Sequence, residues 1–298
     1  MKYADMAVPS RALHLWRYTP WARIHPSNVE DVPDASGIRF NIVEGDELVE
    51  GAPRIVNADD IGRVFLSELG GSSWTYESTG QADVVHLQAV ASGHVAVGHL
   101  HLSLKHDVTV MLHLSGESDW AGLHVTGEIG ANVRAGFGLV NELASNGKLL
   151  HCEDWVVNRD ASLELAGLSI GGFRCKSDVR THFTASGGAL TQAISVHGSG
   201  QRHVDHHIEV HHDVPHTDSS LNIHAACFQP FVNFFLSRNI NSKGETFPYK
   251  LFVHLLIGLR SNFIVSHCFI AFNTTISALS SSISLLSSLI VSLCAFLY

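Results

Sequence analysis

The middle of the chain consists of short runs in which apolar residues alternate with polar or small ones. The alternation recurs throughout residues 82–226 and is clearest at Val108, Val110, Leu112 and Leu114. Successive side chains of a strand point to opposite faces of a sheet, so this period of two predicts half-buried β-strands. Glycines separate the runs, and helical spacing is weak. We therefore predict a mainly β core over residues 82–226.

A loose motif recurs where four of the expected strands begin. Its copies lie at residues 107–110, 130–133, 160–163 and 188–191, at intervals of 23, 30 and 28 residues. A turn and strand repeating at such an interval fit one coil of a parallel β-helix, in which each coil stacks on its neighbours. A β-sandwich or a jelly roll also contains short strands and glycine turns. The pattern alone leaves both architectures open.

The residues before the core, 1–81, are predicted to form an N-terminal segment of short helices and loops. A short helix fits Ser10 to Trp16, because the turn at Pro20 ends the pattern. A longer helix fits Asp59 to Leu69, where apolar residues follow helical spacing after two aspartates that are N-cap candidates.

The residues after the core, 227–298, form a hydrophobic tail of different composition. Residues 261–298 contain no Asp, Glu, Lys or Arg. The segment 275–298 is long enough to cross a bilayer as a helix, although eight serines lower its hydrophobicity. Three interpretations stay open for it: a C-terminal transmembrane helix, a translation outside the native reading frame, and a buried helix.

The charge of the chain argues against nucleic-acid binding. Residues 1–224 hold 27 acidic and 15 basic residues, a net charge of −12, within a total of −9 for the chain. A nucleic-acid-binding surface needs clustered Lys and Arg opposite the phosphates. The N-terminus lacks the charged-then-apolar order of a secretory signal. We therefore expect a cytoplasmic protein that does not bind nucleic acid.

The cysteines are few and dispersed, and no two of them form a Cys-x-x-Cys pair. They are Cys152, Cys175, Cys227, Cys268 and Cys294. This spacing excludes a thiolate zinc knuckle and a dense disulfide scaffold, and it is typical of a reducing compartment. Cys152 and Cys175 lie in the expected strands, where a buried cysteine behaves as a small apolar residue.

The segment 198–220 is rich in histidine, the commonest metal ligand, and acidic residues are interspersed with the histidines. In a strand, His203, His207 and His211 share one face, while His206 and His212 point to the other. A ladder of histidines on a solvated face needs no metal. A divalent-metal site at His203, His207 and His211 is the second interpretation, although a straight strand spaces such residues ~13 Å apart.

Several motifs in a fixed order resemble those of the SufB/SufD family of iron–sulfur cluster assembly scaffold proteins, with a SufD-like motif near the start. The resemblance spans about residues 14–226. The matching positions are Trp16-Arg17-Tyr18-Thr19-Pro20-Trp21, Gly171-Gly172-Phe173-Arg174 with Arg180, Ala185-Ser186-Gly187-Gly188-Ala189, Gly200-Gln201, Asp205-His206, His212-Asp213-Val214-Pro215 and Ser219.

The resemblance implies a right-handed parallel β-helix, which favours the solenoid over the sandwich. It also implies two partners, a SufB-like scaffold protein and a SufC-like ABC ATPase. In such an assembly an iron–sulfur cluster is held only transiently, together with a partner, before its transfer to other proteins. No cofactor is expected to stay bound to this chain.

One part of the family pattern is missing. Family members continue with more β-helix coils and a helical region that carries a Cys/Ser-x-His-Gly-Ala motif, tied to cluster assembly. Nothing after Ser220 matches, and no Gly-Ala follows His254 or His267, so we transfer the role to neither. We expect a β-helix whose last coil lacks a cap.

No motif indicates a catalytic site. The chain has neither a Gly-x-Ser-x-Gly elbow nor a phosphate-binding Gly-x4-Gly-Lys-Ser/Thr loop, so ATP hydrolysis would come from a partner. The leading hypothesis is therefore a non-enzymatic component of the SUF scaffold. Two other hypotheses remain: a metal-dependent jelly-roll enzyme that uses the histidines, and a binding protein tethered to a membrane through residues 275–298.

Overall fold

The computed structural model describes residues 2–44, 47–54, 56–57 and 59–228, and the strands at 233–242, 249–259 and 262–264. Its elements are, in chain order, η1 Tyr3–Asp5, η2 His14–Trp16, α1 Trp21–Ile24, β1 Ser36–Gly37, β2 Arg39–Glu44, β3 Leu48–Glu50, α2 Ile61–Leu69, β4 Ser72–Glu77, β5 Val84–Ala91, β6 Val95–Leu104, β7 Val108–Gly116, β8 Trp120–Ile129, β9 Arg134–Leu143, β10 Lys148–Val157, β11 Ser162–Ser169, β12 Arg174–Phe183, β13 Ala189–Ser199, β14 His203–His212, β15 Asp218–Phe228, β16 Asn233–Ser242, β17 Tyr249–Leu259 and β18 Asn262–Ile264.

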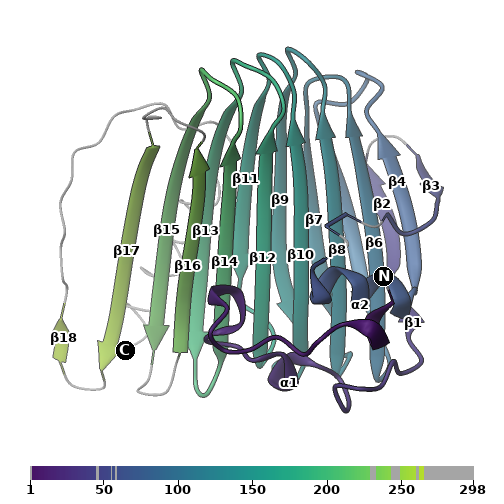
Figure 1. Cartoon of the computed structure of the whole chain (residues 1–298), viewed down its shortest axis with the longest axis vertical. Helices are drawn as coiled ribbons and strands as arrows, with labels where there is room; N and C mark the ends of the chain where they lie inside the picture. The colour runs from purple at the N-terminus through teal and green to yellow at the C-terminus, as the bar shows by residue number, and fades with distance from the viewer. Residues whose placement is uncertain are drawn as a thin grey trace.

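Alternate strands belong to two different sheets, so the chain winds as a parallel β-solenoid (Figure 1). Sheet one contains β4, β6, β8, β10, β12, β14 and β16, which pair in parallel in that order. Sheet two contains β5, β7, β9, β11, β13, β15 and β17, also parallel. Among the described strands, antiparallel pairs occur only where β3, β2 and β18 join the sheets. The mainly β, solenoid prediction is confirmed, and the jelly-roll hypothesis is wrong, because a jelly roll is built of antiparallel strands.

The strand register defines the repeat that the sequence indicates. In sheet two, Val108 pairs with Ala135, and Ser162 pairs with both Arg134 and Ala189. Successive coils of this sheet therefore recur at a nearly constant interval along the chain. The four copies of the loose motif precede or overlap the starts of β7, β9, β11 and β13. Their spacing is less even than the register, because the motif follows the turns, and the turns differ in length.

The main core lies between the two sheets. In β6, Leu100, Leu102 and Leu104 point between the sheets, whereas Val95 and Val97 point outwards and pack against the N-terminal segment. Both faces of this strand are buried, so apolar residues occupy odd-numbered as well as even-numbered positions. The sequence shows them as two separate alternating runs, although they belong to a single strand.

A second core forms where the N-terminal segment covers the outer face of sheet one (Figure 1). Phe65 on α2 makes edge-to-face contacts with Trp21 and Trp120, at ring-centroid distances of 5.3 and 6.1 Å. Gly122 on β8 lies beneath α2, and a Cβ at this position would overlap the side chain of Leu66. The absence of a side chain there lets the helix approach the sheet closely.

The helix predicted after the two aspartates is confirmed as α2. Asp60 is its N-cap, and its side chain accepts a hydrogen bond from the backbone N–H of Arg63 at 3.1 Å. The short helix predicted for residues 10–16 is limited to the single 3-10 turn η2.

Two predictions on the flanks need correction. The N-terminal segment contains strands as well as helices and loops, and both β1 and β4 pair in parallel with β6 of sheet one. The sequence of β4, Ser-Ser-Trp-Thr-Tyr-Glu, is short and largely polar, which hides the alternation. Beyond residue 226, where the sequence pattern predicts the end of the core, β16 and β17 are strands that extend the two sheets.

The segment 275–298 lies outside the described residues, and so does its interpretation as a transmembrane helix. Within the described part of the chain, no helix combines the length and apolar character needed to cross a membrane.

Candidate functional site

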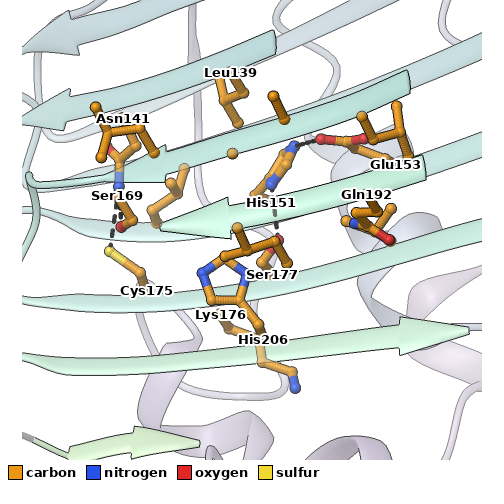
Figure 2. Close-up of a pocket in the computed structure, with 17 residues that line it drawn as sticks. Leu139, Asn141, His151, Glu153, Ser169, Cys175, Lys176, Ser177, Gln192 and His206 are labelled. Carbon is orange, nitrogen blue, oxygen red and sulfur yellow. Dashed lines mark hydrogen bonds and ion pairs between the residues drawn. The ribbon is translucent and has the colours of Figure 1, made fainter. Parts of the chain in front are cut away.

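A small cavity lined by both apolar and polar side chains lies inside the solenoid, between the two sheets (Figure 2). The ring of His151 lies between Ser177 and Glu153, with Nδ1 2.9 Å from Ser177 Oγ and Nε2 3.0 Å from Glu153 Oε1. The indole of Trp155 donates a hydrogen bond to the other oxygen of Glu153 at 2.7 Å. Burial, followed by the charges of His151 and Lys176, lowers the pKa of the neighbouring His206 to about 3.

The size of this cavity limits what it can hold. Its volume of about 40 Å³ is enough for one or a few water molecules. Sites for small organic ligands are typically about 300–1,000 Å³. The cavity is therefore too small for a ligand of that kind.

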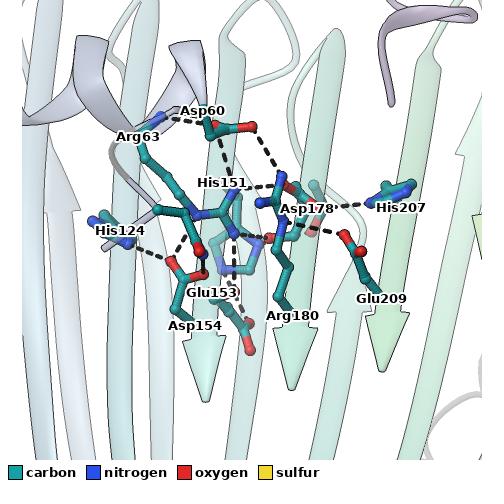
Figure 3. A network of polar contacts seen from close by, with 12 residues as sticks. Asp60, Arg63, His124, His151, Glu153, Asp154, Asp178, Arg180, His207 and Glu209 are labelled. Carbon is teal, nitrogen blue, oxygen red and sulfur yellow. Dashed lines mark hydrogen bonds and ion pairs between the residues drawn. The ribbon is translucent and has the colours of Figure 1, made fainter. Parts of the chain in front are cut away.

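A second polar cluster lies on the outer face of sheet one, beneath the N-terminus of α2 (Figure 3). Arg63 lies at its centre, with Nε 2.7 Å from Asp154 Oδ2 and Nη1 2.5 Å from Asp178 Oδ2. Arg180 contacts both Asp60 and Asp178, at 2.9 and 2.8 Å. We call this group, together with His124, His207 and Glu209 at its edges, the α2 clamp.

The electrostatics of the α2 clamp favour its charged form. Burial disfavours the guanidinium of Arg63, but the carboxylates of Asp178, Asp154 and Asp60 outweigh it and raise the pKa of Arg63. Burial likewise opposes ionisation of Asp178, yet Arg63 and the hydrogen bond from His207 hold the pKa of Asp178 well below its usual range. These charges pair with one another, so the clamp joins the N-terminal segment to the solenoid.

The histidines of β14 lie on the two faces that the sequence predicts. His203, His207 and His211 point outwards, and His206 and His212 point between the sheets. The outward face is not the solvated ladder that the simpler interpretation assumes. Asp205 and His207 are 1% and 5% exposed, because residues of the N-terminal segment lie over them. His203 Nε2 is 2.8 Å from Thr19 Oγ1 in that segment.

The three predicted metal ligands do not converge in the structure. His203 contacts Thr19, His207 contacts Asp178 at 2.7 Å, and His211 contacts Glu209 at 3.1 Å. A strand separates residues i and i+4 by ~13 Å, so one strand alone does not bring such side chains together.

A different group of ligand-type side chains does come together. The donor atoms of His182, His211 and Asp213 all lie within 4.8 Å of one another, the one such group among the described residues. The sequence interpretation missed His182 because it lies on another strand. His182 and His211 are direct partners in the register of neighbouring coils. The interval of the repeat is therefore the sequence feature that could have identified His182.

The His-x-x-Pro segment and the serine after it build the corner between β14 and β15. The ring of His212 is fully buried, with Nδ1 2.7 Å from Thr217 Oγ1 and Nε2 3.0 Å from Ser219 Oγ. Pro215 is exposed in the turn, and His216 has a positive φ of 59°. His212 thus holds the two ends of the turn together.

Comparison with known families identifies the solenoid. Residues 81–229 match the family model described as "SUF system FeS cluster assembly, SufBD core domain". The chain belongs to the SufBD core family. Searches of the curated proteins and of the solved structures found no match. Membership assigns the chain to SUF iron–sulfur cluster assembly, in a family of scaffold and assembly proteins.

In this member of the SufBD core family, most of the motif residues are buried or form turns. Trp16 is buried beneath Lys176, whose Nζ lies 5.9 Å from the ring, and Lys176 also pairs with Asp205 at 3.1 Å. The neighbouring Tyr18 and Pro20 are half-buried. Gly200 adopts a left-handed φ of 62° in the turn before β14, and Gln201 beside it is exposed.

Cys152 and Cys175, the cysteines whose side chains the structure describes, lie inside the protein. Cys152 and Cys175 are free and buried, at 1% and 4% exposure, which confirms their prediction as core residues. Burial raises the pKa of both thiols. The thiolate is the form that binds metal, so neither side chain is a ready ligand for iron.

Proposed function

We propose that the chain is a SufD-like scaffold subunit that pairs with a SufB-like protein and a SufC-like ABC ATPase in the cytoplasm. The observation that carries this proposal is the match of the SufBD core family to residues 81–229, a range that coincides with the coils from β5 to β15. The iron–sulfur cluster is the cargo of such an assembly and not a resident cofactor of this chain.

The chemistry of the described side chains supports a role without catalysis. The charges of the α2 clamp pair with one another, and the cavity between the sheets has room for water only. Cys152 and Cys175 are buried thiols. In this proposal, a partner supplies ligands to the cluster.

Co-expression tests the partnership. The tagged chain, a SufB-like protein and a SufC-like ATPase from the same organism are produced together and separated by size-exclusion chromatography with light scattering. We expect one stoichiometric complex that contains all three. Gly127→Leu is the matched control, because a side chain at Gly127 would overlap the indole of Trp155 in the core, so loss of the fold should abolish assembly. A chain that elutes alone while the other two form a complex without it would refute the proposal.

Anaerobic reconstitution tests the role in cluster assembly. Ferric iron, a thiol reductant and sulfide are added to the chain alone and to the complex, and both samples are desalted. We expect the visible absorbance of an iron–sulfur cluster only in the complex. A cluster that stays on the isolated chain with stoichiometric iron would show that the chain is a cluster-binding protein in its own right.

A further inference from the structure

Two histidines on neighbouring coils face each other on the outer surface of sheet one. His182 on β12 and His211 on β14 are direct partners in the parallel register. Their rings stack with centroids 4.0 Å apart and an angle of 7° between the planes. Asp213 follows two residues after His211, where β14 has ended and the chain turns.

We propose that His182, His211 and Asp213 form a binding site for a divalent transition-metal ion of the Zn²⁺ or Fe²⁺ type. Two imidazoles and one carboxylate are a donor set that both ions accept in proteins. Bound donors would lie about 2.0–2.2 Å from the ion. The donor atoms already lie within 4.8 Å of one another, and binding would turn the two rings out of their stack so that one nitrogen of each points to the ion.

The surroundings of the site favour metal binding over a purely structural cluster. Asp213 is exposed and both histidines are half-buried, so an ion can reach them from solvent. Three protein ligands leave at least one coordination position for water or for a donor from another molecule.

A carboxylate beside the site connects it to the α2 clamp. Glu209 Oε1 lies 3.1 Å from His211 Nε2, and Glu209 Oε2 lies 3.5 Å from Arg180 Nε. Carboxylates next to metal-binding histidines fix the orientation of the ring and increase its basicity. Glu209 is therefore assigned as a positioning residue for His211.

Metal titration of the isolated chain tests the site, independently of any SUF partner. The chain is freed of metal with a chelator, and Co²⁺ and Zn²⁺ binding are followed by Co²⁺ absorption and by equilibrium dialysis with metal analysis. We expect one ion per chain. His182→Ala and Asp213→Asn should each weaken binding at least by the roughly 10- to 100-fold that loss of a supporting residue costs. Asp213 lies in an exposed turn, so its variant reports on the site even if His182→Ala unfolds.

The controls separate this site from other histidines of the chain. His113→Ala removes an exposed histidine paired with Glu142 at 2.7 Å and should leave the affinity unchanged. His203→Ala should also bind metal as the wild type does. Wild-type affinity in both His182→Ala and Asp213→Asn would overturn the proposal. So would a loss in His203→Ala equal to that in His182→Ala, which would favour the ligand set predicted from β14 alone.

Discussion

Arg63 on α2 and Asp154 on β10 form an ion pair, with 2.7 Å between Nε and Oδ2, in which both side chains are almost fully buried. The same guanidinium contacts Asp178 on the next coil. One residue of the N-terminal segment therefore binds two coils of the solenoid. Because these charges have little access to water, each depends on its partners for stabilisation.

Replacing Arg63 should destabilise the fold strongly. Arg63→Ala leaves the carboxylates of Asp154 and Asp178 buried without their main partner, and removing one partner of a buried pair costs about 3–5 kcal/mol. Urea unfolding followed by circular dichroism measures the difference. Arg159→Ala is the control, because Arg159 is exposed and its Nε lies 3.7 Å from Asp160. An exposed pair contributes about 0–1 kcal/mol. Equal effects of the two substitutions would mean that the α2 clamp does not stabilise the fold.

Two glycines on neighbouring coils should respond oppositely to alanine. A Cβ at Gly127 would overlap the indole ring of Trp155. Overpacking of this kind costs about 1–3 kcal/mol, so Gly127→Ala should lower the free energy of unfolding. At Gly167 the nearest atom to a new Cβ is Ile194 Cγ1 at 3.9 Å. Gly167→Ala should be neutral or stabilising by about 0.4–1 kcal/mol, because it restricts the unfolded chain. Chemical denaturation of both variants decides whether the space around Trp155 is as tight as the structure shows.

The stability contributions of His212 and Ser219, which share a hydrogen bond at the corner between β14 and β15, should be coupled. His212→Ala leaves the buried hydroxyls of Thr217 and Ser219 without their imidazole partner, a loss of about 1–3 kcal/mol. Ser219→Ala should cost about 1 kcal/mol. The double variant should lose less than the two single losses combined, since the residues share one hydrogen bond. Full additivity in this double-mutant cycle would contradict the contact. His86→Ala, at an exposed histidine of β5, serves as the control for a histidine without a core role.

The alternation predicts strands within residues 82–226, but it does not show which strands lie side by side. The alternation from Val108 to Leu114 predicts β7, because one face of that strand packs in the core and the other does not. Register between coils depends on turn lengths, which the pattern does not define. The meeting of His182 with His211, and that of Arg63 with Asp154, follow from register and from the packing of α2. Neither is visible in a linear pattern, although the recurring length of a coil narrows the choice of partners for His182.

Stability should fall as pH drops through the range in which buried histidines resist protonation. His99 on β6 is 4% exposed, and its Nε2 donates to the carbonyl oxygens of Leu66 and Gly70 at the end of α2, at 3.2 and 3.0 Å. Its Nδ1 has no hydrogen-bond partner among the described residues. Burial, and then the neighbouring His124, lowers the pKa of His99 to about 4.

The sign of this effect follows from proton binding in the two states. Above pH ~6.5 the ring of His99 is neutral in both the folded and the unfolded chain, so its burial does not reduce the free energy of unfolding. Between pH ~6.5 and about 4 only the unfolded chain takes up the proton, and the free energy of unfolding decreases. The pKa shift of His99 alone corresponds to a loss of about 3 kcal/mol in the free energy of unfolding, and this loss levels off below pH ~4. Lowered pKa values at His25, His101, His197, His203, His206 and His212 act in the same direction.

His99→Gln isolates the contribution of this residue. The amide still donates to the end of α2 but does not titrate, so the variant should lose less stability than the wild type between about pH 7.5 and about pH 4.5. Urea unfolding at several pH values gives both slopes. The remaining histidines should preserve part of the pH dependence in the variant. An unchanged slope would show that His99 is protonated in the folded chain at its ordinary pKa, and that the end of α2 does not enclose it.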